Sequence, residues 1–90
     1  MFGPVLPIVT FKTEQEAIKL ANETMYGLGA YVYTKDKERA GRVAKAIESG
    51  MVSVNSTNYV MPFNPFGGYK NSGLGRENSK YGFHEVTQIK

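Results

Sequence analysis

Apolar residues in the first 55 positions recur at helical spacing in two segments and form short runs in three others. The run Val5–Phe11 is rich in β-branched residues and predicts a buried strand. Pro7 has no amide to donate to a ladder, so that end of the strand should lie near a sheet edge. Thr13 to Glu16 fits a capping box that opens a helix. The helix should weaken near Thr24 and stop before Gly27.

A second helical segment carries the clearest apolar stripe in the chain. Its members recur at the three- and four-residue spacing of an amphipathic helix: Ala40, Val43, Ala44 and Ile47. Asp36 is placed to cap the start of this helix. Gly50 suits the left-handed position that ends many helices. We therefore predict a helix between these two residues.

Short strands are predicted on both sides of that helix, at Ala30–Thr34 and Met51–Val54. Residues 1–55 then form a βαβαβ unit, and this order favours an α/β fold with parallel strands joined by right-handed crossovers. Parallel sheets are normally covered on both faces, which indicates a three-layer arrangement. Three strands are too few to close a core. We therefore expect an incomplete piece of a larger sheet.

Residues 56–90 break this alternation and form a second region. An irregular loop with exposed apolar side chains is expected first, at Tyr59, Val60, Met61 and Phe63. Asn64–Glu77 follows, N-P-F-G-G-Y-K-N-S-G-L-G-R-E, with four of the ten glycines of the chain. Such glycine density predicts a shaped loop without regular structure. A short helix from about Gly75 to Glu85 and the start of a strand at Thr87–Lys90 complete the prediction.

The glycine-rich loop does not match the common phosphate-binding fingerprints. The P-loop needs lysine at the position where Leu74 stands, and the dinucleotide motif that starts at Gly73 ends wrongly at Asn78. The simplest interpretation is that the glycines make tight turns. Arg76 and Glu77 would then pair or cap a helix.

Composition and charge exclude several classes of function. Cysteine is absent and His84 is the single histidine, which removes disulfides, thiolate chemistry and the usual zinc cages. The net charge of +3 is spread along the chain, so we expect no nucleic-acid partner. No apolar run is long enough to cross a bilayer, and no signal peptide is evident. We expect no membrane partner and a cytoplasmic location.

Four motifs together carry a resemblance to a known family. They are Phe2-Gly3-Pro4-Val5, Ala21-Asn22 through Tyr26-Gly27-Leu28, Val54-Asn55, and Pro65-Phe66-Gly67-Gly68-x-Lys70-x-Ser72-Gly73-x-Gly75-Arg76-Glu77. In this order and spacing they resemble the C-terminal end of the aldehyde dehydrogenase superfamily. The resemblance covers essentially all 90 residues, and the last motif is the most specific.

The resemblance implies an NAD- or NADP-dependent oxidoreductase that takes an aldehyde to a carboxylic acid. In that family a cysteine thiolate attacks the aldehyde, hydride passes to the nicotinamide, and a glutamate activates the water that releases the acid. The family carries these groups and its cofactor domain upstream of the matching segment. The chain is thus expected to be a C-terminal fragment. By itself it should bind no cofactor and show no activity.

The resemblance also assigns roles to individual positions. Phe2 matches an aromatic residue near the nicotinamide, and Glu77 matches a glutamate that relays protons toward the base. Residues that line the aldehyde tunnel are matched by Ser56, Val60 and Phe66. Lys70 and Gly73 match backbone contacts to a potassium ion between subunits.

Two other hypotheses remain beside the enzyme fragment. A non-enzymatic assembly or partner-binding module could use the same segment as structure alone. A small anion or nucleotide binder could use the glycine-rich loop, although the failed fingerprints disfavour it. The fragment hypothesis predicts exposed apolar surface and hence self-association or a homo-oligomer. Neither the aldehyde nor the choice between NAD and NADP follows from the sequence.

Overall fold

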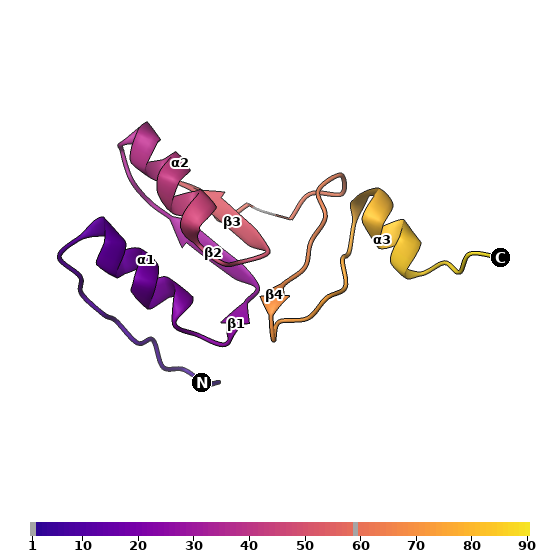
Figure 1. The fold of residues 1–90 in the computed structure, drawn as a ribbon, viewed down its shortest axis with the longest axis horizontal. Helices are drawn as coiled ribbons and strands as arrows, with labels where there is room; N and C mark the ends of the chain where they lie inside the picture. The colour runs from indigo at the N-terminus through magenta and orange to yellow at the C-terminus, as the bar shows by residue number, and fades with distance from the viewer. Residues whose placement is uncertain (1, 59) are drawn as a thin grey trace.

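The computed structural model describes residues 2–58 and 60–90, so the expectation for Tyr59 lies outside the described residues. Helices and short strands follow one another along the chain (Figure 1). In order they are α1 Glu14–Asn22, β1 Tyr26–Gly27, β2 Gly29–Val32, α2 Lys37–Ala46, β3 Met51–Val54, β4 Tyr69–Lys70 and α3 Ser79–Glu85.

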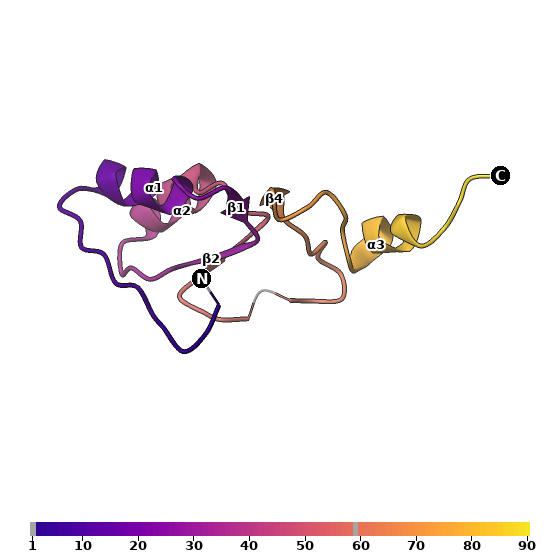
Figure 2. The ribbon, with the colours of Figure 1, turned by 90° about the horizontal axis from the view of Figure 1, so that it is seen from below.

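Strands β2 and β3 pair in parallel, and α2 forms the crossover between them. The register runs from Gly29 opposite Met51 to Val32 opposite Val54. This confirms the predicted α/β class and the parallel pairing of these two strands. Helices α1 and α2 lie side by side on the same face of the pair (Figure 2). The described residues therefore supply two of the three expected layers, and the opposite sheet face is left without a covering helix.

The N-terminal segment differs from its prediction. Residues 5–11 are extended but form no strand, because no described strand lies alongside to complete a ladder. Their side chains face solvent, with Leu6 82% and Ile8 83% exposed. Apolar periodicity marks a segment that can be buried, whereas a strand also requires a hydrogen-bonding partner.

Side-chain caps begin both of the longer helices, as predicted. The Glu16 amide donates to Thr13 Oγ1 over 3.1 Å. The returning Glu16 carboxylate accepts from the Lys12 amide at 2.8 Å, one residue earlier than in a standard capping box. Asp36 Oδ1 accepts from the amides of Glu38 and Arg39, each at 3.0 Å. These contacts fix where α1 and α2 start.

Gly50 does not end α2 in a left-handed conformation. The helix closes at Ile47, whose backbone is extended, and Gly50 has no positive φ. A Cβ on Gly50 would instead collide with the carbonyl oxygen of Gly67. The prediction of a left-handed cap is wrong. Gly50 instead leaves room for the backbone of the glycine-rich loop to pack closely beside the start of β3.

The glycine-rich segment contains more regular structure than predicted. Strand β4 pairs antiparallel with β1, with Tyr26 opposite Lys70 and Gly27 opposite Tyr69. Helix α3 begins at Ser79 and not near Gly75, because the backbone at Glu77 is held in a β-bridge. Residues 87–90 form no strand. The long loop is thus a set of short backbone pairings.

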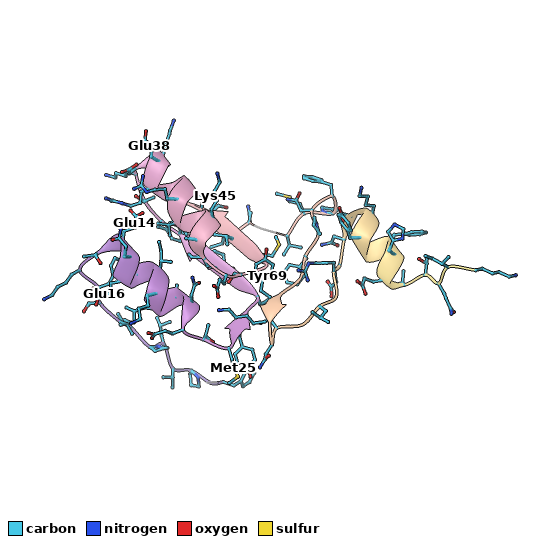
Figure 3. All side chains as sticks on the ribbon, viewed as in Figure 1. Glu14, Glu16, Met25, Glu38, Lys45 and Tyr69 are labelled. Carbon is cyan, nitrogen blue, oxygen red and sulfur yellow. The ribbon has the colours of Figure 1, made fainter. Side chains whose placement is uncertain are left out.

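Burial is sparse throughout the described residues. Among the described residues, Val32, Ala40 and Ser53 are the only buried ones that carry a side chain, beside the buried glycines Gly27, Gly67 and Gly68. Large apolar side chains are exposed along the whole chain (Figure 3). The accessible surface of 7576 Å² exceeds the roughly 5,200 Å² of a compact protein of this mass. The radius of gyration is 15.1 Å, against about 12 Å for a compact chain of this length. The expected exposed apolar surface is therefore present. No helix in the described part is long and apolar enough to span a membrane.

Candidate functional site

The glycine-rich loop folds back on itself so that two predicted site residues become neighbours. Phe66 donates its amide to the Glu77 carbonyl at 2.8 Å, and Glu77 donates to the Phe66 carbonyl at 2.7 Å. At the tip, the Ser72 amide donates to Tyr69 and the Gly73 amide to Lys70. The loop thus has two hydrogen-bonded arms, at Phe66 and Glu77, and a tight turn between them.

Glycines let this loop lie directly against the α/β body. Gly67 and Gly68 are buried, and Gly67 touches Gly50 through backbone atoms alone. The Gly27 amide donates to Ser72 Oγ at 2.9 Å, which holds the tip of the loop to β1. The Asn71 amide donates to the Met25 carbonyl at 3.0 Å. Side chains larger than hydrogen would push these segments apart.

Lys70 makes the most extensive side-chain contacts of the loop. Its ammonium lies 2.7 Å from Glu48 Oε2 and donates to the carbonyl oxygens of Asn22 at 2.9 Å and Thr24 at 3.3 Å. The sequence had suggested only a backbone role for Lys70. The Asn22 side chain joins the same network, since it donates to Ala46 O and accepts from the Glu48 amide, both at 2.9 Å.

Two hollows flank the loop. One, of about 340 Å³, is lined by residues that include Leu28, Phe66, Glu77 and Glu85. The other, of about 360 Å³, is lined by residues that include Glu48, Lys70 and Gly73. Arg76 borders both hollows. The loop is therefore a partition that separates the Phe66–Glu77 side from the Lys70–Gly73 side.

Arg76 and Glu77 do not form the expected pair or helix cap. Arg76 Nη1 donates to the carbonyls of Leu74 at 3.2 Å and Gly75 at 2.9 Å, so the guanidinium braces its own turn. Asn78 occupies the N-cap position of α3 and makes no side-chain capping bond. Glu77 is left exposed beside the ring of Phe66. Both residues line the same hollow.

The other predicted contacts lie outside these hollows. Phe2 is fully exposed, and Val60 is 56% exposed. Ser56 Oγ accepts from the Asn58 amide at 3.0 Å, a local turn contact. The structure thus brings together Phe66 with Glu77 and Lys70 with Gly73. It does not bring Phe2, Ser56 or Val60 to either group.

Lys70 and Gly73 are the residues expected to contact potassium. The Lys70 carbonyl accepts from the Gly73 amide at 3.3 Å, so part of its acceptor capacity is used within the turn. Within residues 2–58 and 60–90, no group of three or more His, Cys, Asp or Glu side chains is arranged to hold a metal ion. The potassium contact stays a prediction.

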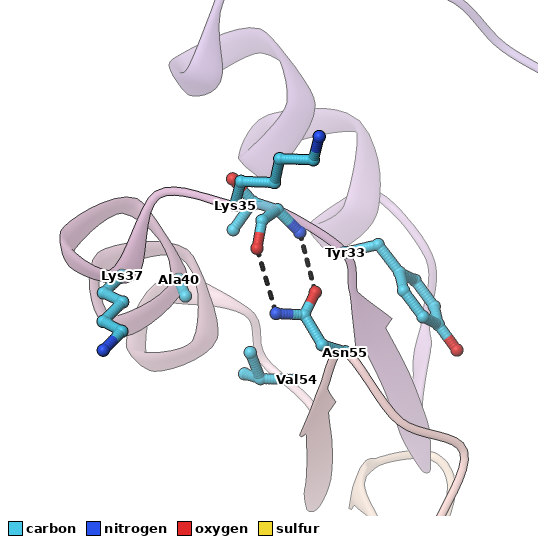
Figure 4. Close-up of a pocket in the computed structure, with 7 residues that line it drawn as sticks. Tyr33, Lys35, Lys37, Ala40, Val54 and Asn55 are labelled. Atoms are coloured by element: carbon cyan, nitrogen blue, oxygen red, sulfur yellow. Dashed lines mark hydrogen bonds between the residues drawn. The ribbon is translucent and has the colours of Figure 1, made fainter.

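A larger hollow lies at the carboxyl ends of β2 and β3 (Figure 4). It measures about 790 Å³ and is lined by Tyr33, Thr34, Lys35, Lys37, Ala40, Val54 and Asn55. The position is one where open α/β sheets often bind ligands. However, the Asn55 amide is engaged at both ends: it accepts from the Thr34 amide and donates to the Thr34 carbonyl, each at 2.9 Å. It clamps the two strand ends together, and none of the predicted site residues lies here.

The chain matches the aldehyde dehydrogenase family over residues 1–90. It is 52% identical over 90 residues to the mitochondrial succinate-semialdehyde dehydrogenase of Oryza sativa subsp. japonica. It is 51% identical over 89 residues to the succinate semialdehyde dehydrogenase of Acinetobacter baylyi. These alignments cover 100% and 99% of the chain but only 17% and 18% of the two relatives.

Solved structures agree with the sequence comparison. A succinate-semialdehyde dehydrogenase from Burkholderia pseudomallei superposes with a TM-score of 0.89 at 48% identity, over 98% of this chain and 18% of that one. A betaine aldehyde dehydrogenase from Staphylococcus aureus in complex with NAD+ superposes with a TM-score of 0.88 at 47% identity, over 92% of this chain and 16% of that one.

The fold, including the glycine-rich loop, is therefore similar to that of one segment of these solved dehydrogenases. The chain belongs to the aldehyde dehydrogenase family. It spans about a sixth of the length of the relatives described above.

Proposed function

We propose that these residues form one wall of the active site of an NAD-dependent aldehyde dehydrogenase, which oxidises an aldehyde to a carboxylic acid. The observation that carries this proposal is the reciprocal hydrogen bonding of Phe66 and Glu77. This backbone pairing places the side chains of Phe66 and Glu77 next to each other, and both residues line one hollow. An aldehyde tunnel needs both an apolar lining and a group able to pass protons.

The proposed roles follow from the chemistry of the side chains. Phe66 presents apolar surface to the aldehyde at this hollow. Val60 and the Ser56 hydroxyl, which lie outside the hollow, are proposed to line another part of the tunnel. Glu77 is exposed and has the proposed role of a proton relay, because a carboxyl group can both accept and donate a proton. The thiolate nucleophile and the general base come from residues outside this chain, which contains no cysteine.

NAD, when bound, supplies the acceptor for the hydride that leaves the substrate carbon. Among the described residues, Phe2 is the one expected to contact the cofactor, beside the nicotinamide. Its ring is fully exposed and lines none of the hollows described above. The NAD+ complex of the Staphylococcus aureus structure supports NAD as the cofactor, with NADP as the alternative. The isolated 90 residues are not expected to bind either one.

Relatives named for succinate semialdehyde and betaine aldehyde support these two aldehydes as candidate substrates. We also propose two regions, residues 1–55 and residues 56–90. Asn55 marks their boundary, because its positive φ and its two bonds to Thr34 close the end of the β2–β3 pair. The cytoplasmic location stays a prediction, and the rice relative is named as mitochondrial.

The test is an assay of the complete protein that carries these residues. NADH formation is expected from NAD+ and at least one of succinate semialdehyde, betaine aldehyde and a short aliphatic aldehyde. Glu77→Gln should lower turnover roughly tenfold to a hundredfold, since it removes a proton-transferring group. Glu23→Gln, which changes an exposed carboxylate beyond the end of α1, should leave turnover unchanged. Failure to reduce NAD+ or NADP+ with every aldehyde would refute the proposal.

The exposed apolar surface also favours a second candidate, a module that binds a partner chain without catalysis. Both candidates predict association through this surface, and a homo-oligomer is one form of it. They differ in the complete protein, where only the enzyme forms NADH. A stoichiometric complex without dehydrogenase activity would support the module.

A further inference from the structure

The ammonium of Lys70 is saturated by acceptors of the protein itself. An ammonium has three N–H groups, and three oxygens lie within reach: Glu48 Oε2 at 2.7 Å, Asn22 O at 2.9 Å and Thr24 O at 3.3 Å. The side chain is 26% exposed, so the charge is partly withdrawn from water. Such a group is held in one place by its contacts and does not sample solvent as a surface lysine does.

The three acceptors come from two parts of the chain that lie far from Lys70 in sequence. Asn22 ends α1, and its carbonyl and that of Thr24 lie at the negative end of this helix, which favours a cation. Glu48 lies between α2 and β3, and its own amide is held by Asn22 Oδ1 at 2.9 Å. Lys70 therefore ties the loop to the C-terminal ends of both long helices.

The backbone of Lys70 supports the same conclusion. Its φ is +54°, a left-handed conformation that glycine adopts easily and a long side chain adopts at a cost. A glycine here would relieve the backbone but would lose the ammonium. The chain carries lysine at this position, which indicates that the side-chain contacts outweigh the backbone strain.

Lys70 lies between the two arms of the loop. Its anchor fixes the tip, and the tip connects directly to Phe66 on one side and to Glu77 on the other. The Lys70 anchor therefore acts together with the β1–β4 pairing and the Gly27–Ser72 bond to place Phe66 and Glu77 relative to the sheet, and it is the ion pair among these contacts.

We propose that Lys70 is a positioning residue whose ammonium, through Glu48 and the end of α1, sets the location of Phe66 and Glu77 in the wall of the active site. The catalytic part of this proposal rests on the proposed dehydrogenase function. The structural part, the anchoring of the loop, stands independently.

The kinetic test uses the complete protein with Lys70→Met, which keeps the length of the side chain and removes its charge and donors. If the loop moves, kcat/KM should fall by about 100-fold. The kcat calculated per folded molecule should fall too, which shows that the loss is not only a smaller amount of folded protein. Lys45→Met is the matched control, because Lys45 is exposed on α2 and its loss changes the net charge equally (Figure 3). The control should retain the parent kcat/KM.

Chemical rescue separates an ammonium from mere packing. Lys70→Ala leaves space beside the Glu48 carboxylate, so ethylammonium should restore at least about a tenth of the lost activity by supplying the same charge-assisted bonds. Ethanol, which is neutral and of similar size, should restore none, and sodium chloride controls for ionic strength. Equal rescue by ethanol would assign Lys70 a packing role and overturn the proposal.

Hydrogen exchange tests the anchor without reference to catalysis. In Lys70→Met the amides of Phe66 and Glu77 should exchange about tenfold faster or more, while those of β2 and β3 stay as protected as in the parent. Glu48→Gln, which keeps both carbonyl acceptors, should give a smaller effect and serves if the Lys70 variants do not fold. Unchanged exchange at Phe66 and Glu77 in the variants that fold would refute the anchor. If no aldehyde is oxidised by the parent protein, the dehydrogenase proposal fails while the exchange data still decide the anchor.

Discussion

Single residues fix the contacts between the glycine-rich loop and the α/β body. Gly50 and Gly67 meet backbone to backbone, and Gly27 lies against the carbonyl of Glu48. Each of these contacts requires the absence of a side chain and not an unusual φ, because none of the three has a positive φ. The glycines thus determine how closely the loop packs against its neighbours.

Gly50→Ala should destabilise the protein, because the added methyl group overlaps the Gly67 carbonyl and forces the loop outward. The expected cost is about 1–3 kcal/mol, the usual range for overpacking. Gly41→Ala is the control: Gly41 is exposed on α2 with open space around it, and alanine there should stabilise the protein by about 0.5–1 kcal/mol. The midpoint of thermal unfolding should fall in the first variant and rise in the second. Equal midpoints would contradict the close packing.

Asn55 joins the ends of β2 and β3 through one side chain. Asn55→Gly keeps the positive φ and removes both bonds to Thr34, so it should cost about 1–2 kcal/mol. Asn55→Ala should cost more, because alanine also resists the left-handed backbone. Asn58→Ala, in an exposed part of the neighbouring loop, should be close to neutral. The order of the three thermal midpoints checks this prediction, and a reversed order of the two Asn55 variants would contradict it.

At the scale of elements, one carboxylate holds the two long helices together. Glu14 at the start of α1 accepts from Arg42 Nε at 3.0 Å, Arg42 Nη2 at 3.1 Å and Arg39 Nε at 3.2 Å. The hydrogen bond from Arg42 lowers the pKa of Glu14, with a further contribution from Arg39. The backbone amide of Arg39 similarly lowers the pKa of Asp36, the cap of α2. Both helices are therefore arranged around ionised carboxylates.

This arrangement predicts a loss of stability in acid. A carboxylate with a pKa lowered by folding stabilises the protein above its ordinary pKa, and this stabilisation is lost as the pH falls through the lowered value. Thermal midpoints should therefore fall as the pH drops below about 4, the ordinary pKa of carboxyl side chains. Glu14→Gln should be less stable than the parent at neutral pH and should lose less on acidification. Glu23→Gln, an exposed control, should follow the parent curve. Identical pH profiles for Glu14→Gln and the parent would refute the role of this contact.

At the scale of the whole molecule, the described residues form an open arrangement and not a closed core. Their longest dimension is 53 Å and their shortest is 22 Å. The extended N-terminal segment and the uncovered face of the β2–β3 pair both present apolar side chains to solvent. Surfaces of this kind are normally buried against further protein.

Residues 1–90 produced by themselves should therefore self-associate. Sedimentation velocity at micromolar concentration should show species larger than the 10.0 kDa chain, with the fraction rising with concentration. Replacing Leu6 and Ile8 by glutamine should reduce association, because both side chains are more than four-fifths exposed. Replacing Lys35 and Lys37 by glutamine should not reduce it. A stable monomer at all concentrations would contradict the prediction.

Local sequence determined the elements whose signals are local. The capping residues Thr13 and Asp36 and the stripe through Ala40 and Val43 placed α1 and α2 correctly, because helix bonds and caps form between near neighbours in the chain. The apolar run at Met51–Val54 likewise became a strand. The motifs around the glycine-rich loop indicated the family, since their order and spacing are read directly from the chain.

Only the tertiary structure decided contacts between distant segments. Whether Val5–Phe11 forms a strand depends on the presence of a partner strand. The requirement for glycine at position 50 comes from the close approach of Gly67, which is distant in sequence. The acceptors of Lys70 are likewise remote from it, so no local pattern pointed to its ammonium. Pairing, close backbone approach and ion pairs join residues that sequence order separates. The sequence therefore determined the two long helices and the family, while the folded chain determined the start of α3 and how the loop around Phe66 and Glu77 is held.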